Sequence, residues 1–345
     1  MTLRIDDLAG AGIVAPERLD ALRQVAAQFS VALTQDVAEL IDPADPADPI
    51  AAQFVPSAAE LEIAAEEQAD PIGDERWSPV PGIVHRYPDR VLLKPSLVCP
   101  VYCRYCFRRE QIGVRGQVLG RAALDRAYAY ISERPEIWEV VVTGGDPLLL
   151  SSRRVATIVR SLAAIDHVQV IRFHSRVPVV DPRRVNAALV AALDAGKAVY
   201  VVIHANHPRE LTPAVRGAVT KLVRGGIPIL SQSVLLRGVN DDAAVLEQLF
   251  RALVAMRVKP YYLHHPDLAL GTAHFRGDIA EGQSLMRELR RRASGLCQPT
   301  YVLDIPGGYG KVPVGPCWAR RDGEGWRVED SAGRCHRYPP ASGDR

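Results

Sequence analysis

The sequence lacks the features that mark membrane, secreted and nucleic-acid-binding proteins. No run of 18 apolar residues occurs in its 345 residues, so no transmembrane helix is expected. The first residues carry acids and include no long apolar segment, so we expect no secretory signal and a cytoplasmic location. Charge nearly cancels, with 42 basic and 40 acidic side chains, and no basic run of five occurs. We therefore predict neither a nucleic-acid partner nor a membrane partner.

Cysteine is scarce, and its distribution is uneven. Of six cysteines, three fall within eight residues, and Cys297, Cys317 and Cys335 are scattered. Disulfide frameworks are typical of shorter, cysteine-dense secreted chains, so the cluster predicts a metal site. Cys297 precedes a strand and is expected to be a small buried hydrophobe. Cys317 and Cys335 could bind a metal together, but the interpretation that they have no role is favoured.

From about residue 90 the sequence alternates between β-branched runs and amphipathic stretches of helical period, with a repeat of roughly 30 residues. The predicted strands are Val91–Leu93, Glu139–Thr143, Val168–Phe173, Ala198–His204, Pro228–Val234 and Val258–Leu263. The predicted helices are Arg121–Glu133, Arg154–Ala164, Arg183–Ala195, Pro213–Arg224 and Asp242–Met256. This α/β pattern predicts a partial (βα)6 TIM-like barrel with function at the carboxyl ends of the strands. A flat doubly wound sheet is the alternative.

Three domains are expected. Residues 1–85 form an N-terminal helical region, in which Ala15–Phe29 and Ser57–Gln68 are predicted helices on either side of an Asp-Pro breaker run. Residues 86–300 form the barrel. Residues 301–345 form a C-terminal segment that becomes rich in Gly, Arg and Pro, with a short tail.

The cysteine cluster has the spacing C-x3-C-x2-C, formed by Cys99, Cys103 and Cys106 just after the first predicted strand. Thiolates are soft ligands that suit iron–sulfur clusters and zinc, but a structural zinc site usually needs four protein ligands. Three thiolates on a [4Fe–4S] cluster leave one iron open, and that iron can bind the amino and carboxylate groups of S-adenosylmethionine (SAM). A zinc knuckle with a distant fourth ligand and accidental clustering are the alternatives.

Two glycine motifs follow other predicted strands. Gly144-Gly145-Asp146 follows the second strand, where exposed backbone groups could hold the amino group of SAM, although such a turn alone is a weak signal. Lys311 follows the glycine-rich run Gly307–Gly310. It could contact a phosphate, form a Schiff base, or be a solvated loop lysine.

Taken together, these motifs resemble the lysine 2,3-aminomutase family of radical SAM enzymes over residues 75–315. The supporting segments are the cysteine motif with its Arg-Arg extension, Gly-Gly-Asp-Pro-Leu-Leu-Leu, Asp-x-Pro-Gly-Gly-x-Gly-Lys, Arg86-Tyr-Pro-Asp-Arg90, 232–241 and His274-Phe-Arg276. The resemblance implies a [4Fe–4S] cluster on the three cysteines, with SAM held near Gly144, Gly145, Asp146 and His204. It also implies pyridoxal phosphate (PLP) on Lys311, with its phosphate held by Arg86, Arg90 and Gln232.

The resemblance implies the substrate contacts as well. Arg108 would pair with the α-carboxylate, and Asp267 and Asp304 would hold the ε-ammonium of L-lysine. The enzyme would be an isomerase, an intramolecular aminotransferase that moves the 2-amino group of lysine to C3 and gives β-lysine. A glutamate-specific relative should lack both acids. An electron donor such as flavodoxin or ferredoxin and a homo-oligomer, dimer or tetramer, are expected.

Several alternatives stay open. The substrate could be another diamino acid, or the enzyme could supply β-lysine for the modification of elongation factor P, whose associated aminomutase is similarly short. A radical SAM fold that has lost catalysis and only binds a partner is the alternative from another class. The zinc site of longer relatives is expected to be absent, because Asp242 stands where they carry a cysteine and the tail has only two.

Overall fold

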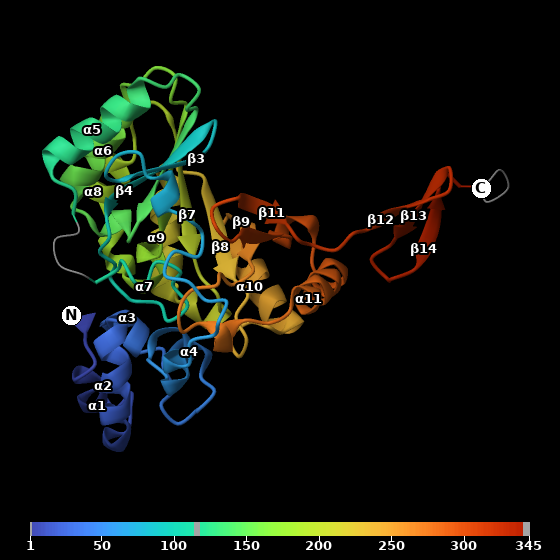
Figure 1. The fold of residues 1–345 in the computed structure, drawn as a ribbon, viewed down its shortest axis with the longest axis horizontal. Coiled ribbons are helices and arrows are strands. Elements are labelled where there is room, and N and C mark those ends of the chain that lie inside the picture. Colours follow the sequence, from blue (N-terminus) through green and yellow to red (C-terminus); the bar gives the residue numbers. More distant parts are fainter. Residues whose placement is uncertain (1, 114–117, 341–345) are drawn as a thin grey trace.

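The structure is a computed structural model, and it describes residues 2–113 and 118–340 (Figure 1). Residue 1 and residues 341–345, at the ends of the first and last predicted domains, lie outside the described residues, as do residues 114–117. The chain forms an N-terminal helical region, a curved central sheet covered by helices, and a C-terminal arm (Figure 1).

The central sheet has nine strands within the described residues, and they follow one another in chain order. They are β3 (Ile83–Tyr87), β4 (Arg90–Ser96), β5 (Glu139–Gly144), β6 (Val170–Ser175), β7 (Ala198–His204), β8 (Ile229–Val234), β9 (Val258–His264), β10 (Thr300–Ile305) and β11 (Gly310–Pro313). Strands β4 to β10 are parallel, and β3 and β11 close the two edges in antiparallel orientation. The unbroken order confirms the barrel-like fold, since a doubly wound sheet reverses its order at a switch point.

Helices cover the outer face of this sheet (Figure 1). The helices and single helical turns between β4 and β10 are α5 (Arg121–Ser132), η4 (Pro147–Leu149), α6 (Ser152–Ala163), α7 (Val177–Val180), η5 (Pro182–Arg184), α8 (Ala187–Ala192), η6 (Pro208–Glu210), α9 (Pro213–Arg224), α10 (Ala243–Ala255), η7 (Ala273–Phe275), α11 (Ile279–Arg292) and η8 (Gly295–Cys297). Each long helix buries its apolar stripe, as α6 does with Val155, Ile158, Val159 and Leu162. The predicted helix at 183–195 is shorter than expected, because Asn186 caps a new start at α8.

The N-terminal region contains β1 (Thr2–Leu3), α1 (Asp7–Gly10), η1 (Pro16–Arg18), α2 (Leu19–Gln28), β2 (Leu33–Thr34), α3 (Gln35–Ala38), α4 (Pro49–Phe54), η2 (Ala58–Leu61) and η3 (Glu75–Trp77). The predicted helix over 15–29 is confirmed as η1 and α2. At the end of the Asp-Pro run, Asp48 caps α4 by accepting from the amides of Ile50 and Ala51.

The predicted helix over 57–68 is wrong, because only the single turn η2 forms there. Two of its four acids, Glu60 and Glu67, are buried instead of lining a solvated helix face. The Glu60 side chain is fully buried against two arginines, and Glu67 accepts from the amides of Gly271 and Thr272. These tertiary contacts satisfy the carboxylates better than a local helix could, so the chain leaves the helical path after Leu61.

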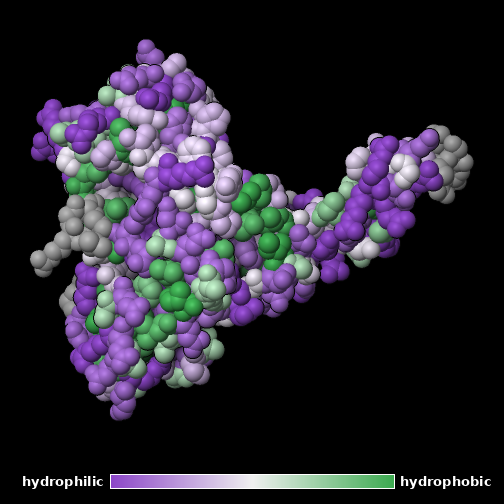
Figure 2. Space-filling model, viewed as in Figure 1, coloured by the Kyte–Doolittle hydropathy of each residue, from purple (hydrophilic) through white to green (hydrophobic). Residues whose placement is uncertain are grey.

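The C-terminal arm is a three-stranded antiparallel sheet of β12 (Ala319–Asp322), β13 (Gly325–Glu329) and β14 (Cys335–Tyr338). It extends away from the barrel (Figure 1), and its surface is mainly hydrophilic (Figure 2). Across the described chain, every helix is too short or too polar to cross a membrane.

Candidate active site

A cavity of about 550 Å³ lies at the carboxyl ends of the parallel strands. That volume falls within the range of small-molecule and cofactor sites. It is lined by the β3–β4 hairpin, the loop after β4, residues of β5 to β9, and the β10–β11 hairpin. The cavity brings together every predicted site residue: Cys99, Cys103, Cys106, Gly144, Gly145, Asp146, His204, Arg86, Arg90, Gln232, Arg108, Asp267, Asp304 and Lys311.

The cysteine loop, residues 97–109, is held by β5 through very close backbone contacts. The Gly145 amide donates to the Ser96 carbonyl at 2.8 Å, and the Asp146 amide donates to the Val98 carbonyl at 2.9 Å. A Cβ on Gly145 would lie 2.4 Å from the Val98 carbonyl oxygen, which no side chain tolerates. The glycine pair is therefore needed to seat the cysteine loop on the strand.

The Asp146 side chain orders backbone rather than facing the cavity freely. One carboxylate oxygen accepts from the Leu148 amide at 3.1 Å and the Ser175 hydroxyl at 2.7 Å. The other accepts from the amides of Arg176 at 2.6 Å and Val177 at 2.9 Å. These four bonds tie the end of β5 to the turn after β6, so the group that this segment can offer to a ligand is its backbone.

The cysteine loop also carries a layer of buried ion pairs with the N-terminal region. Arg104 donates to Glu60 through Nε at 3.0 Å and through Nη2 at 2.5 Å, and Arg109 pairs with the same carboxylate. Burial alone would raise the pKa of Glu60, but Arg104 and Arg109 hold it below its usual value. Since Arg104 and Arg109 flank the second and third cysteines, these pairs fix the loop that presents the thiols.

The thiols themselves sit in an environment that disfavours thiolate without a metal. Burial and the nearby Asp146 raise the pKa of Cys99 well above its usual value. Burial and the Cys103 thiol raise the pKa of Cys106 to about 11. Within the described residues no three His, Cys, Asp or Glu side chains converge on a single point as around one metal ion.

Lys311 lies on β11 directly opposite Asp304 on β10. Its Nζ forms an ion pair with Asp304 Oδ2 and lies 3.3 Å from His264 Nδ1. Burial and the neighbouring Lys311 cation lower the pKa of His264 to about 4, so this histidine is neutral near pH 7. Burial opposes ionisation of Asp304, but His264 and Lys311 hold its pKa well below the usual range.

The glycine run before Lys311, residues 307–310, packs against the segment 70–77. The Trp77 indole donates to the Gly308 carbonyl at 3.1 Å, and a Cβ on Gly308, where φ is +84°, would lie 2.6 Å from that indole nitrogen. The Lys311 amide donates to the Tyr87 hydroxyl at 2.7 Å. These contacts fix the hairpin that aims Lys311 into the cavity.

Asp267, in the loop after β9, is partly buried and is the exception among the acids of the cavity. It lines the cavity, and its carboxylate has no ion-pair or hydrogen-bond partner within the described part of the chain. Burial and the nearby Asp304 carboxylate raise the pKa of Asp267 to about 7. This side of the cavity therefore holds a carboxyl group that a bound cation would ionise.

The three predicted arginines differ in their surroundings. Arg108 donates through Nε to Asp74 at 2.8 Å. Arg86 pairs with the same Asp74 at 3.4 Å and lies 3.7 Å from Asp304. Arg90 is more exposed, pairs with Asp89 at 2.7 Å, and stacks over the Tyr87 ring. Asp74 thus gathers two of the predicted anion-binding side chains.

Several cavity-lining residues were missed by the sequence analysis. They are Tyr105, Arg172, His174, Arg176, Tyr262 and His264. All except Tyr105 stand in or just after the last residues of predicted strands, so their position at the active edge of a barrel was a usable signal. The Nε2 atoms of His174 and His264 are buried without a partner, which fits a cavity built for a polar ligand.

Comparison with known proteins agrees with this architecture. Residues 93–249 match the Radical SAM superfamily. The L-lysine 2,3-aminomutase of Clostridium subterminale is 42% identical over 300 residues, which cover 87% of this chain and 72% of that protein. The chain belongs to the lysine 2,3-aminomutase family of radical SAM enzymes. This confirms the predicted family, and with it an isomerase of the aminomutase class.

This aminomutase family includes more than one substrate class. The glutamate 2,3-aminomutase of Clostridioides difficile is 36% identical over 312 residues, covering 90% of this chain and 74% of that protein. Among solved structures, a radical SAM methyltransferase from Sphaerobacter thermophilus aligns with a TM-score of 0.47 at 17% identity, over 64% of this chain and 68% of that one.

Membership of the family implies a [4Fe–4S] cluster, SAM and PLP as cofactors, a small amino acid as substrate, and a reductant. The donor set fits these groups: three thiols for iron, and a lysine with nearby arginines for a phosphorylated aldehyde. Outside the cavity, Cys297 is buried in the core as predicted, whereas Cys317 and Cys335 are exposed.

Proposed function

We propose that this aminomutase acts on L-lysine and converts it to β-lysine. The observation that carries the proposal is Asp267, a partly buried carboxyl that has no ion-pair partner within the described residues and lies near Asp304 in the cavity that the cysteines and Lys311 also line. A substrate that ends in an ammonium group would pair with both acids. A substrate that ends in a carboxylate, such as glutamate, would be repelled by them.

The cysteine side of the cavity, residues 97–109 with β5 and β6, would hold the cluster and SAM. Cys99, Cys103 and Cys106 would ligate three irons of a [4Fe–4S] cluster, leaving the fourth for SAM. The amides of Gly145 and Asp146 already donate to Ser96 and Val98, and the Asp146 carbonyl accepts from the Leu149 amide, so the Gly145 carbonyl would accept from the SAM ammonium. His204, the last residue of β7, would lie beside the bound SAM.

Once bound, the reduced cluster and SAM supply a carbon radical that abstracts hydrogen, and PLP supplies the electrophilic carbon through which an amino group migrates. The residues of this chain then have to orient the substrate, exclude water and keep the charges balanced.

The lysine side, formed by His264, Asp267, Asp304 and Lys311, would hold PLP and the far end of the substrate. Arg86, Arg90 and Gln232 would bind the phosphate, and the Lys311 amine would bind the aldehyde carbon. In the structure Lys311 pairs with Asp304. Its amine must leave that carboxylate to bind the cofactor, which frees Asp304 for the substrate ammonium. Until the cofactor binds, the Lys311 ammonium therefore occupies the position on Asp304 that the substrate ammonium would take.

Arg108 would bind the substrate α-carboxylate. Asp74 fixes its Nε, and within the described residues no side chain accepts from its two Nη atoms. Those two donors form the planar fork that matches a carboxylate. With Arg108 at one end and the acid pair at the other, a diamino acid would be held at both ends.

We also propose a flavodoxin or ferredoxin as the reductant, a cytoplasmic location and a homo-oligomeric state. The domain boundaries at residues 85 and 300 likewise stay a proposal, and strand β3 runs across the first of them.

Anaerobic turnover with SAM, PLP and dithionite tests the function directly. The purified enzyme would be given L-lysine, L-ornithine or L-glutamate in separate reactions, and the β-amino acids and 5′-deoxyadenosine would be measured by mass spectrometry. We expect β-lysine from L-lysine and no product from L-glutamate. A faster reaction with L-ornithine would show that the acid pair selects a shorter diamino acid, and turnover of L-glutamate would overturn the assignment of the acids.

A further inference from the structure

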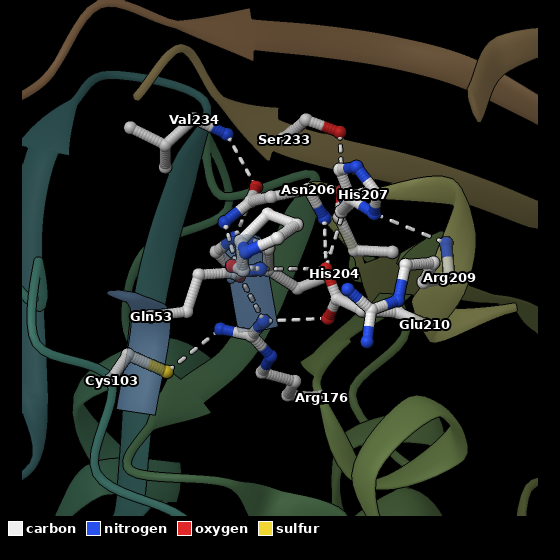
Figure 3. A network of polar contacts seen from close by, with 12 residues as sticks. Gln53, Cys103, Arg176, His204, Asn206, His207, Arg209, Glu210, Ser233 and Val234 are labelled. Atoms are coloured by element: carbon white, nitrogen blue, oxygen red, sulfur yellow. Dashed lines mark hydrogen bonds and ion pairs between the residues drawn. The ribbon is translucent and has the colours of Figure 1, made fainter. Parts of the chain in front are cut away.

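The turn after β6 places one arginine in contact with a cysteine of the cluster motif (Figure 3). Arg176 Nη1 donates to Cys103 Sγ at 2.9 Å, and the same nitrogen contacts the Tyr105 hydroxyl. The Arg176 side chain is only 6% exposed. A guanidinium this deeply buried needs fixed partners, and none of the functional roles above uses it.

The other side of the guanidinium is held rigidly. Nη2 donates to Gln53 Oε1 at 2.8 Å and to Glu210 Oε2 at 2.7 Å. The remaining oxygen of Glu210 accepts from the amides of Asn206 at 2.7 Å and His207 at 2.9 Å, so this carboxylate cannot turn away. Figure 3 shows these groups converging from α4, the loop after β7, and η6.

The contact makes the three cysteines unequal. Cys103 alone has a side-chain guanidinium hydrogen-bonded to its sulfur within the described residues. Reduction from the 2+ to the 1+ state adds one negative charge to a [4Fe–4S] cluster. A donor on a ligating sulfur stabilises that added charge, so it raises the reduction potential.

We propose that Arg176 is a positioning residue that hydrogen-bonds the Cys103 thiolate of the bound cluster and raises its reduction potential. This inference rests on the proposed cluster. The function of the contact is to make the 1+ state, which must pass its electron to SAM, easier to reach with a biological reductant. Glu210 holds the guanidinium in place without touching the sulfur.

Redox titration of the reconstituted protein, followed by electron paramagnetic resonance, tests the inference. The variants are Arg176→Gln, which removes the charge and changes the donor, and Arg176→Lys, which keeps the charge. Gln53→Ala is the matched control, because it removes another partner of the same guanidinium and leaves the sulfur contact. Iron content and the visible spectrum are measured first on the wild-type protein.

The expected order of midpoint potentials is Arg176→Gln lowest, Arg176→Lys intermediate, and Gln53→Ala equal to wild type. A wild-type potential in Arg176→Gln would overturn the inference while leaving the proposed function intact. If Arg176→Gln takes up no cluster, the midpoint potential of Arg176→Lys is the test, and a wild-type potential in Arg176→Lys would overturn the inference. Absence of a cluster from the wild-type protein would instead contradict the cluster assignment, and this inference with it.

Discussion

The cysteine side and the lysine side of the cavity treat buried charge in opposite ways. On the cysteine side, Glu60 forms ion pairs with both Arg104 and Arg109, and Glu210 forms one with Arg176. On the lysine side, Asp304 has the internal cation of Lys311, but Asp267 has no partner within the described residues. Each of these three arginines therefore has a carboxylate partner within the protein, whereas the lysine side keeps one carboxyl group for another cation.

This difference follows from what each side must do. A cluster site must be rigid and in place before any substrate arrives, so the protein supplies its own counter-charges. A substrate site must exchange its occupant, so one carboxyl is left for the ligand to neutralise. Substitutions that remove one charge at a time on each side test this difference.

The largest effect is expected from the two groups that hold the cofactors. Cys99→Ala should lose the iron–sulfur absorbance and all SAM cleavage but keep PLP binding, and Lys311→Ala should lose the PLP band but keep the cluster. Turnover should vanish in both. Iron analysis and absorbance spectra measure the two losses separately. Loss of both cofactors in either single variant would show that the two sides are not independent.

Next comes the buried charge layer of the cysteine side. Glu60→Gln leaves Arg104 and Arg109 without their carboxylate, and breaking such a buried pair costs about 3–5 kcal/mol. For a chain of this size we expect the melting temperature to fall by roughly 10 °C. Asp322→Asn, which breaks the exposed Arg327 pair in the arm, is the matched control and should cost under about 1 kcal/mol. Equal thermal shifts would contradict the rigid-layer interpretation.

Asp267→Asn should separate function from stability. Without the carboxylate, kcat/KM for L-lysine should fall about 10²–10³-fold, from a loss of about 3–4 kcal/mol of pairing. At pH 7.5 an unfolded Asp267 is ionised, whereas burial in the folded chain resists ionisation, so the native carboxyl costs stability. The variant should therefore melt at a higher temperature than wild type, measured by calorimetry. Asp125→Asn on α5 is the exposed control, and unchanged lysine kinetics in Asp267→Asn would remove this residue from the substrate site.

The smallest effect is the pH dependence of lysine binding. Because the pKa of Asp267 is about 7 in the empty cavity, the carboxyl is mostly protonated at pH 6 and mostly ionised at pH 8. Binding of an ammonium requires the ionised form, so affinity should rise about tenfold between those values and binding should release a proton below pH 7. Calorimetry in buffers of different ionisation enthalpy measures the proton. The same proton release in Asp267→Asn would assign it to another group.

Much of the barrel could be predicted from local pattern. Strand β7 and helix α9 begin and end where the β-branched and amphipathic runs do, because their apolar periods match the faces they bury. The predicted helix over 57–68 failed because Glu60 and Glu67 are held by partners far along the chain. A strand was expected after Cys297, where β10 lies, although its bounds were not predicted, and helix α11 was missed.

The sequence by itself determined the cysteine spacing, the two glycine motifs, most of the barrel strands as local segments and the family, since each depends on residues close together in the chain. Only the tertiary structure decided the order of the strands in the sheet and the partners of buried charges. It paired Glu60 with Arg104, Arg176 with Cys103, and Lys311 with Asp304, and it left Asp267 unpaired. Burial makes the neutralisation of each charge mandatory, but which opposite charge lies within reach depends on how distant segments pack.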